Sequence, residues 1–92
     1  MFSKKLFGQR LKECRKKAGE TQTQLGELLS FYKSRISEIE SGNSMATLDK
    51  VALICEHYNV SADYLLGLTD EPKPYKRRKK GSFGKGAVSE AD

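Results

Sequence analysis

The 92-residue sequence lacks the motifs that identify most enzymes. It has no glycine-rich phosphate loop, no nucleophile elbow and no paired-carboxylate motif. Its single histidine, His57, has no recognisable catalytic companion, so a helix-surface or half-buried position is the favoured interpretation. An apolar share of 37% supports a modest core but no deep enzymatic cleft. We therefore predict a protein that is not an enzyme and needs no cofactor.

Features of metalloproteins, membrane proteins and secreted proteins are also missing. The only two cysteines, Cys14 and Cys55, form no CxxC motif and have no histidine near enough to suggest zinc, so we expect two reduced core thiols and no metal. No apolar run approaches the roughly 20 residues that span a bilayer. The N-terminal MFSKKLFGQRLKE lacks the long apolar stretch of a secretory signal. These absences predict a cytoplasmic location and no membrane partner.

The positive charge is unevenly placed along the chain. Residues 1–69 hold ten Lys and Arg against eight Asp and Glu, whereas residues 70–92 hold seven against four. The second segment also contains both prolines, three glycines and the basic run KRRKK (Lys76–Lys80), with almost no apolar periodicity. Such a composition buries too little surface to offset the entropy of ordering. We predict a folded domain over 1–69 and a flexible basic tail over 70–92, which either adds affinity for a polyanion or only solubilises the protein.

Apolar residues recur at helical spacing throughout residues 1–69, and no segment alternates long enough for a strand pair. The pattern predicts an all-α domain of five short helices with caps at Thr21, Thr47 and Ser61. Gly19, Asn59 and Gly67 can end three of these helices in the left-handed conformation. The predicted inward faces, in chain order, are Phe7, Leu11, Cys14 and Ala18; Leu25, Leu28 and Leu29; Ile36 and Ile39; and Leu48, Val51, Ile54, Cys55 and Tyr58.

The second and third predicted helices are joined by SFYK, which contains neither glycine nor proline. Helices of about eight residues are marginal alone, so packing must hold them. Gly26, inside the second helix, suggests that another backbone crosses closely there. A tight turn between two such helices is the helix-turn-helix unit, whose second helix stands out from the body and can enter a groove. On the third helix, about residues 33–40, the outward face is small and polar: Ser34, Ser37, Glu38 and Ser41, with Lys33 at its tip.

The strings TQTQLGELL, SRISEIESGN and ATLDKVALICEHYNVSADYLLG resemble the Xre/Cro/lambda-repressor-like helix-turn-helix domain. The resemblance covers roughly residues 6–67. It implies a five-helix fold and a Cro/C1-type transcriptional regulator, repressor-like, that binds specific sequences of double-stranded DNA as a homodimer. The third helix would enter the major groove.

The resemblance also implies roles for individual residues. Lys33, Ser34, Ser37 and Glu38 match positions that reach base edges, and Gln22, Asn43 and Ser44 match positions that contact phosphate. Arg15 and Glu40 match a pair that joins the first and third helices by a salt bridge. Two contacts stay open: Lys33 can reach guanine or a phosphate, and Glu38 can accept from cytosine N4 or remain in solvent.

The sequence departs from the family pattern in several places. Gly26 replaces the usual alanine, Ser30 the usual glycine of the turn, and Ala46 a frequent proline. Tyr32 occupies a position where a capping Ser or Thr is common. The competing hypothesis is an antitoxin-like or adaptor module that uses the same fold to bind a protein. It needs exposed apolar anchors on the polar face, and only Tyr32 qualifies.

The last predicted helix carries more apolar side chains than so short a helix can bury on its own domain. We therefore expect the dimer seam there, at Tyr64, Leu65, Leu66 and Leu68.

Overall fold

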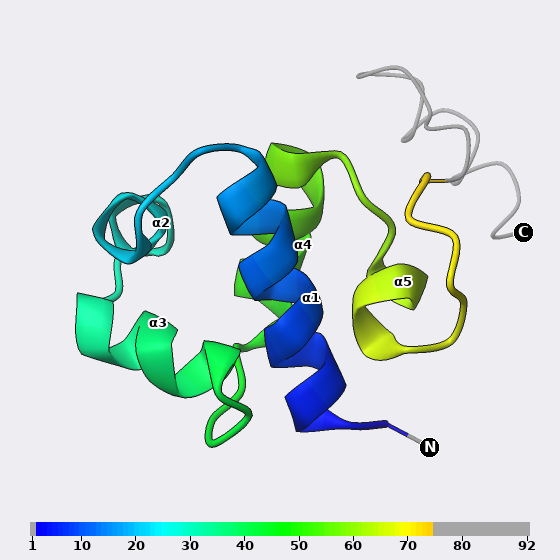
Figure 1. Ribbon diagram of the computed structural model, residues 1–92, viewed down its shortest axis with the longest axis horizontal. Coiled ribbons are helices and arrows are strands. Elements are labelled where there is room, and N and C mark those ends of the chain that lie inside the picture. The colour runs from blue at the N-terminus through cyan, green and yellow to red at the C-terminus, as the bar shows by residue number, and fades with distance from the viewer. Residues whose placement is uncertain (1, 75–92) are drawn as a thin grey trace, which may run out of the picture.

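The computed structural model describes residues 2–74 and folds them into five helices (Figure 1). They are α1 (Lys4–Lys17), α2 (Gln22–Leu29), α3 (Lys33–Glu40), α4 (Leu48–Tyr58) and α5 (Ala62–Leu66). Residues 2–74 contain no strand. The predicted all-α class and the predicted order of helices are confirmed. None of these five helices is long and apolar enough to cross a membrane.

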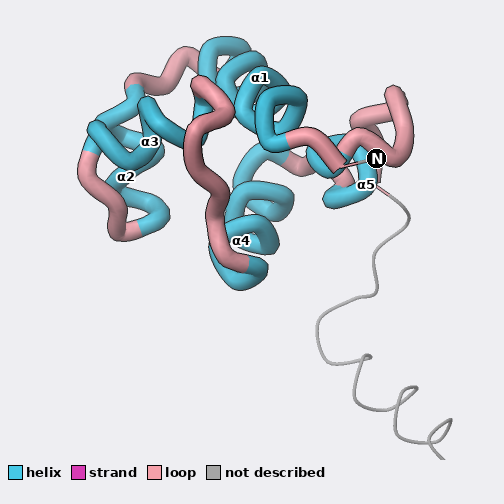
Figure 2. Tube along the Cα trace, turned by 90° about the horizontal axis from the view of Figure 1, so that it is seen from below, coloured by secondary structure: helices cyan, strands magenta, loops and turns pink. Residues whose placement is uncertain are grey.

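The helices are arranged around α1. In Figure 1, α2 and α3 lie on one side of α1 and α5 lies on the other. α4 lies behind α1 in this view, and Figure 2 shows the two separated when the molecule is seen from below. α2 packs on α3, and α3 packs on α1. The position of the α2–α3 pair is therefore set by how α3 meets α1.

The core is formed by apolar side chains from all five helices. Its fully buried members are Phe7, Leu11, Leu25, Leu29, Ile36, Ile39, Ile54 and Leu65. The inward faces predicted from the sequence are thus largely confirmed. The predictions for Ala18, Leu28 and Leu48 are wrong: Ala18 is exposed, and Leu28 and Leu48 have 36% and 85% of their surface exposed. Leu48 is the first residue of α4. Helical side chains lean toward the N-terminus, so Leu48 extends beyond the end of its helix and finds no neighbour to cover it.

Most of the predicted helix ends are confirmed. The Thr21 hydroxyl accepts from the Gln24 N–H at 3.1 Å, and the Gln24 side chain accepts from the Thr21 N–H at 2.8 Å, which completes a capping box. The Ser61 hydroxyl caps α5 by accepting from the Tyr64 N–H at 3.0 Å, and Asn59 ends α4 with a φ of 55°. Thr47 differs, because its hydroxyl donates to the Asp49 carboxylate and gives the helix no side-chain cap.

The turn between α2 and α3 contains two locally unfavourable residues. Ser30 has a φ of 61°, a left-handed conformation that costs a residue other than glycine about 1–2 kcal/mol. Tyr32 occupies the N-cap position of α3 but makes no side-chain hydrogen bond to the helix. A Ser or Thr cap at such a position is worth about 1 kcal/mol. This turn is held by packing and backbone contacts rather than by favourable local residues.

Gly26 allows the turn to pass close to α2. The Phe31 N–H donates to the Gly26 carbonyl at 2.8 Å. A Cβ at Gly26 would lie 2.4 Å from the Phe31 carbonyl oxygen, closer than real atoms approach. The backbone crossing predicted from this glycine is confirmed, and the crossing chain is the turn itself.

A second glycine, Gly8, allows α1 and α3 to meet. A Cβ at this position would lie 2.2 Å from the Ile39 carbonyl oxygen and 2.7 Å from that of Glu40. This crossing at Gly8 was not predicted from the sequence. Like Gly26, Gly8 is a glycine inside an otherwise regular helical pattern, and such a glycine indicates that another backbone passes close to the helix.

Arg15 and Glu40 join the same two helices by a buried ion pair. The Arg15 Nε donates to Glu40 Oε2 at 2.6 Å, and a guanidinium nitrogen donates to Oε1 at 3.0 Å. Another Arg15 nitrogen donates to the Glu20 carbonyl at 2.8 Å. The hydrogen bond to Glu40 raises the pKa of Arg15. Both side chains are buried, so each charge depends on the other for compensation.

Arg10 fixes the chain that follows α5. Its guanidinium donates to the carbonyls of Tyr64 and Thr69 and to the Asp70 carboxylate, and it lies 4.2 Å from the centre of the Tyr64 ring. The Ser61 N–H also donates to the Pro72 carbonyl at 3.0 Å. Residues 70–72 therefore lie against the helices. Residues 75–92 of the predicted tail, with the KRRKK run at 76–80, are outside the described residues, and the flexible tail stays a prediction there.

The seam predicted on α5 must be revised. Leu65 is completely buried in its own domain, and Tyr64 is partly covered by Arg10. Leu68, beyond the helix, keeps 70% of its surface exposed. Because α5 turns its central leucine inward, only the residues at its C-terminal end remain for another surface.

Gly8→Ala is expected to destabilise the domain by about 1–3 kcal/mol, although alanine is the better helix former. The added Cβ would force α1 and α3 apart at their closest approach. Urea unfolding followed by circular dichroism measures this change. Gln9→Ala, on the exposed side of the same helix, is the control and should stay within about 0.5 kcal/mol of the parent. A more stable Gly8→Ala variant would show that the crossing has room.

Removing one member of the Arg15–Glu40 pair is expected to cost more than removing both. Arg15→Met or Glu40→Met leaves a buried charge without its partner, which costs about 3–5 kcal/mol. The double variant removes both charges and should lose less than either single variant. The measurement is a double-mutant cycle in urea. Losses that simply add would mean that the two residues do not interact energetically.

Candidate nucleic-acid interface

The outward face of α3 is polar and exposed. Lys33, Ser34, Ser37 and Glu38 are all exposed, whereas Ile36 and Ile39 on the opposite face are completely buried. The side chains of the four exposed residues make no hydrogen bond or ion pair with any other described residue. The fold thus presents a short helix with four outward polar side chains that have no partner within residues 2–74. Two of these groups are short hydroxyls that leave room for close approach to another surface.

Gln22, at the start of α2, is tied to the buried ion pair. Its side-chain Nε2 donates to Glu40 Oε1 at 3.0 Å, and the side chain is half-buried. A side-chain amide carries two N–H donors, so one remains free. The bond to Glu40 restricts where that second donor can point. Gln22, Glu40 and Arg15 therefore form one connected polar network.

The loop after α3 contains the other two residues predicted to contact phosphate. Asn43 is exposed and Ser44 is half-buried, and the Asn43 backbone N–H donates to the Glu38 carbonyl at 2.9 Å. Gly42 has a φ of 88° and lies against the Lys5 backbone: a Cβ there would be 2.8 Å from the Lys5 Cα. The loop is therefore fixed at both of its sides, by α3 and by the first turn of α1.

Several cations around this loop were missed by sequence reasoning. Lys4 and Lys5 are exposed in the first turn of α1, and Lys5 lies beside Gly42. Arg35 donates to the Met45 carbonyl at 3.1 Å and lies over the Phe31 ring, which Lys50 also approaches. Their positions depend on tertiary contacts and on a loop carbonyl, so no spacing in the sequence marks them. Together they make the surroundings of α3 more basic than the composition of residues 1–69 suggests.

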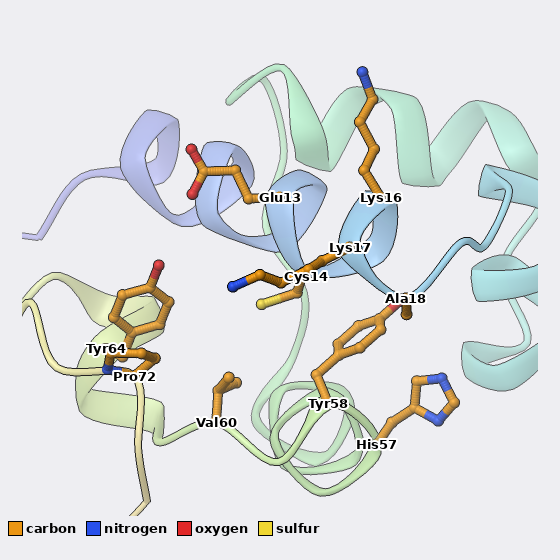
Figure 3. A pocket seen from close by; sticks show the side chains of 10 residues that line it. All are labelled: Glu13, Cys14, Lys16, Lys17, Ala18, His57, Tyr58, Val60, Tyr64 and Pro72. Carbon is orange, nitrogen blue, oxygen red and sulfur yellow. The ribbon is translucent and has the colours of Figure 1, made fainter.

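A separate hollow of about 710 Å³ lies between α1, α4 and α5 (Figure 3). Its walls are largely apolar and include Cys14, Tyr58, Val60 and Tyr64. Cys14 is half-buried and Cys55 is buried, and both are free thiols, as predicted. Burial raises the pKa of the Cys14 thiol. A neutral thiol is a poorer nucleophile than a thiolate, so partial burial makes Cys14 less reactive.

The lone histidine is part of a structural cluster at the edge of this hollow. His57 lies on the surface of α4, with its Nε2 2.6 Å from Glu20 Oε2, and the Tyr58 hydroxyl donates to Glu20 Oε1 at 2.7 Å. Burial of Glu20 opposes its ionisation, but the hydrogen bonds from Tyr58 and His57 outweigh this effect and lower the pKa of the carboxyl. The cluster connects α4 to the segment between α1 and α2. Within residues 2–74 no three His, Cys, Asp or Glu side chains gather as a metal site would require.

Comparison with known proteins agrees with this geometry. A family model described as "Helix-turn-helix domain" matches residues 8–71. The uncharacterized HTH-type transcriptional regulator YobD of Bacillus subtilis (strain 168) is 39% identical over 74 residues, which is 80% of this chain and 66% of that protein. The HTH-type transcriptional regulator ImmR of the same organism is 39% identical over 67 residues, 73% of this chain and 53% of that protein. The chain thus spans about two thirds and about half of the lengths of these curated relatives.

A solved structure shows the same fold. The restriction-modification controller protein C.AhdI from Aeromonas hydrophila superposes with a TM-score of 0.60 at 26% sequence identity, over 67% of this chain and 94% of that one. The family match covers α2, α3, α4 and α5 completely and most of α1. The resemblance read from the sequence is therefore confirmed, and the chain belongs to the helix-turn-helix domain family.

Proposed function

We propose that this protein is a transcriptional regulator, repressor-like, that binds specific sequences of double-stranded DNA by inserting α3 into the major groove. The observation that carries this proposal is the unpaired polar face of α3, held outward by a completely buried apolar face. The relatives named above are called transcriptional regulators, which supports the same role and the absence of an enzymatic one. A cytoplasmic location goes with this proposal.

The candidate contact residues have two different roles: some contact base edges and determine sequence preference, and others contact phosphates and position the domain. Ser34 and Ser37 are short and can donate to or accept from base edges, and Glu38 can accept from cytosine N4. Lys33 can reach guanine or a phosphate. The free donor of Gln22 and the side chains of Asn43 and Ser44 are suited to phosphate oxygens, since phosphate contacts fix register and orientation rather than sequence.

We also propose a homodimer, because an eight-residue recognition helix contacts only a few base pairs. In dimeric helix-turn-helix proteins, two recognition helices lie one turn of DNA apart, about 34 Å. The revised seam consists of Phe2, Leu66 and Leu68. Phe2 is 46% exposed and Leu68 is 70% exposed, and Leu6 of α1 lies close to Gly67 at the end of α5. This gathers exposed apolar side chains from the start of α1 and the end of α5.

The alternative, a protein-interaction or antitoxin/adaptor module, rests on one observation. Tyr32 keeps 87% of its surface exposed beside the polar face of α3. A single aromatic side chain with polar neighbours is a small anchor for a protein partner. Direct binding to duplex DNA distinguishes the two functions.

Gln22→Ala and Ser34→Gln are expected to change DNA binding in different ways. Gln22→Ala should weaken binding to all duplexes alike, by about 0.5–1.5 kcal/mol for the lost hydrogen bond. Ser34→Gln should alter which base is preferred at one position in each half-site, by about 1–3 kcal/mol between the best and worst base. The measurement is binding to a library of single-base changes in a duplex selected from a random pool. Glu27→Ala, on the exposed surface of α2, is the control. If Gln22→Ala reshapes the preference while Ser34→Gln leaves it unchanged, α3 is not the reading element.

Leu68→Lys is expected to dissociate the dimer without unfolding the domain. It places a charge in the proposed seam, where an apolar side chain is mostly exposed in the monomer. Sedimentation equilibrium should show at least a tenfold weaker self-association, about 1.4 kcal/mol or more. Leu48→Lys makes the same change at a still more exposed leucine on α4 and should leave the dimer intact. Equal effects of the two variants would place the seam elsewhere.

A further inference from the structure

Tyr32 is the most exposed large apolar side chain among residues 2–74. It stands directly before α3, at the position where Thr21 and Ser61 cap α2 and α5 with their hydroxyls. Tyr32 supplies no such hydrogen bond, and its ring is not covered by the domain. The residue therefore weakens the start of α3 and contributes no packing in return. Its benefit must lie outside the folded monomer.

Most of the side chains around Tyr32 are polar, and the one other aromatic ring beside it, that of Phe31, is half-buried. An open hollow of about 470 Å³ lies beside Tyr32 on the outside of the α2–α3 turn. The exposed polar residues Thr23, Glu27, Ser30 and Lys33 line this hollow together with Gly26 and the half-buried Phe31. A protein partner usually needs an anchor surrounded by further contacts that exclude water. The isolated ring is better matched to a ligand that offers one small apolar group among many polar ones.

The major groove of DNA offers such a group. Thymine alone presents a methyl group there, beside hydrogen-bond donors and acceptors, and apolar side chains recognise it by contact. The N-terminal residues of a recognition helix contact base edges. Tyr32 adjoins Lys33 and Ser34 at that end of α3. We propose that Tyr32 is a specificity-determining residue that reads thymine by packing its ring against the C5 methyl group. This inference rests on the proposed insertion of α3.

The test compares thymine with uracil, which lacks only the C5 methyl group. Each thymine of the selected duplex is replaced singly, and binding is measured for the parent, Tyr32→Phe and Tyr32→Ser. At one position in each half-site, uracil should weaken binding of the parent about fourfold, the value of one buried methyl group. Tyr32→Phe keeps the ring and should show the same discrimination. Tyr32→Ser should bind thymine and uracil equally.

The serine variant also separates recognition from folding. Serine can cap α3, so its urea midpoint should rise while its thymine preference disappears. If Tyr32 has a purely structural role, Tyr32→Ser will change the urea midpoint and leave the uracil effect unchanged. That result would overturn the proposal. A second outcome would also overturn the proposal: Tyr32→Phe loses as much affinity as Tyr32→Ser, and uracil has no effect at any position. The Tyr32 hydroxyl would then contact phosphate. If the proposed function itself is wrong, the parent protein will show no preference among duplexes, and this outcome differs from those that overturn the proposal for Tyr32.

Discussion

The contact between α1 and α3 sets the position of everything that faces outward. α2 packs on α3, and α3 is attached through its crossing with α1. That crossing is close because Gly8 has no side chain, and its geometry is fixed by the buried pair of Arg15 and Glu40. A buried pair of charges is costly to separate, so α3 can shift only together with its ionic partner. The rigid placement of an eight-residue helix thus comes from tertiary contacts and not from its own helical stability.

The same network connects stability with the proposed DNA contacts. Glu40 accepts hydrogen bonds from Arg15 and from Gln22, so the carboxylate that holds α3 also orients the start of α2. A phosphate bound at Gln22 would meet a donor that is already positioned, which reduces the entropy lost on binding. Changes in this network are therefore expected to affect folding and binding together, whereas changes at Ser34 should affect base preference alone.

The α2–α3 turn departs from the residues that would be best for folding. Ser30 adopts a left-handed conformation that glycine would adopt without strain, and Tyr32 replaces a cap. Proteins tolerate such residues where function requires them and where the surrounding structure compensates. Here compensation comes from Phe31, whose backbone bonds to Gly26 and whose ring packs on the core. The exposed ring of Tyr32 is the part of this turn that folding does not explain.

The sequence by itself determined the helices and most of the core. Phe7, Leu11, Ile36 and Ile39 recur at helical spacing, and Thr21, Ser61 and Asn59 mark helix ends through local hydrogen bonds and backbone preference, all of which act within a few residues. The polar face of α3 follows from the same periodicity, and the pairing of Arg15 with Glu40 came from the family resemblance.

Only the tertiary structure decided how these elements meet. It showed that Gly8 is the crossing point, that Leu48 has no neighbour, that Leu65 is buried, and that Arg10 binds the chain after α5. Each of these depends on residues far apart in the sequence or on backbone carbonyls, which carry no residue-specific signal. Periodicity gives the direction in which a side chain points, but whether another element covers it is set by the packing of the whole domain.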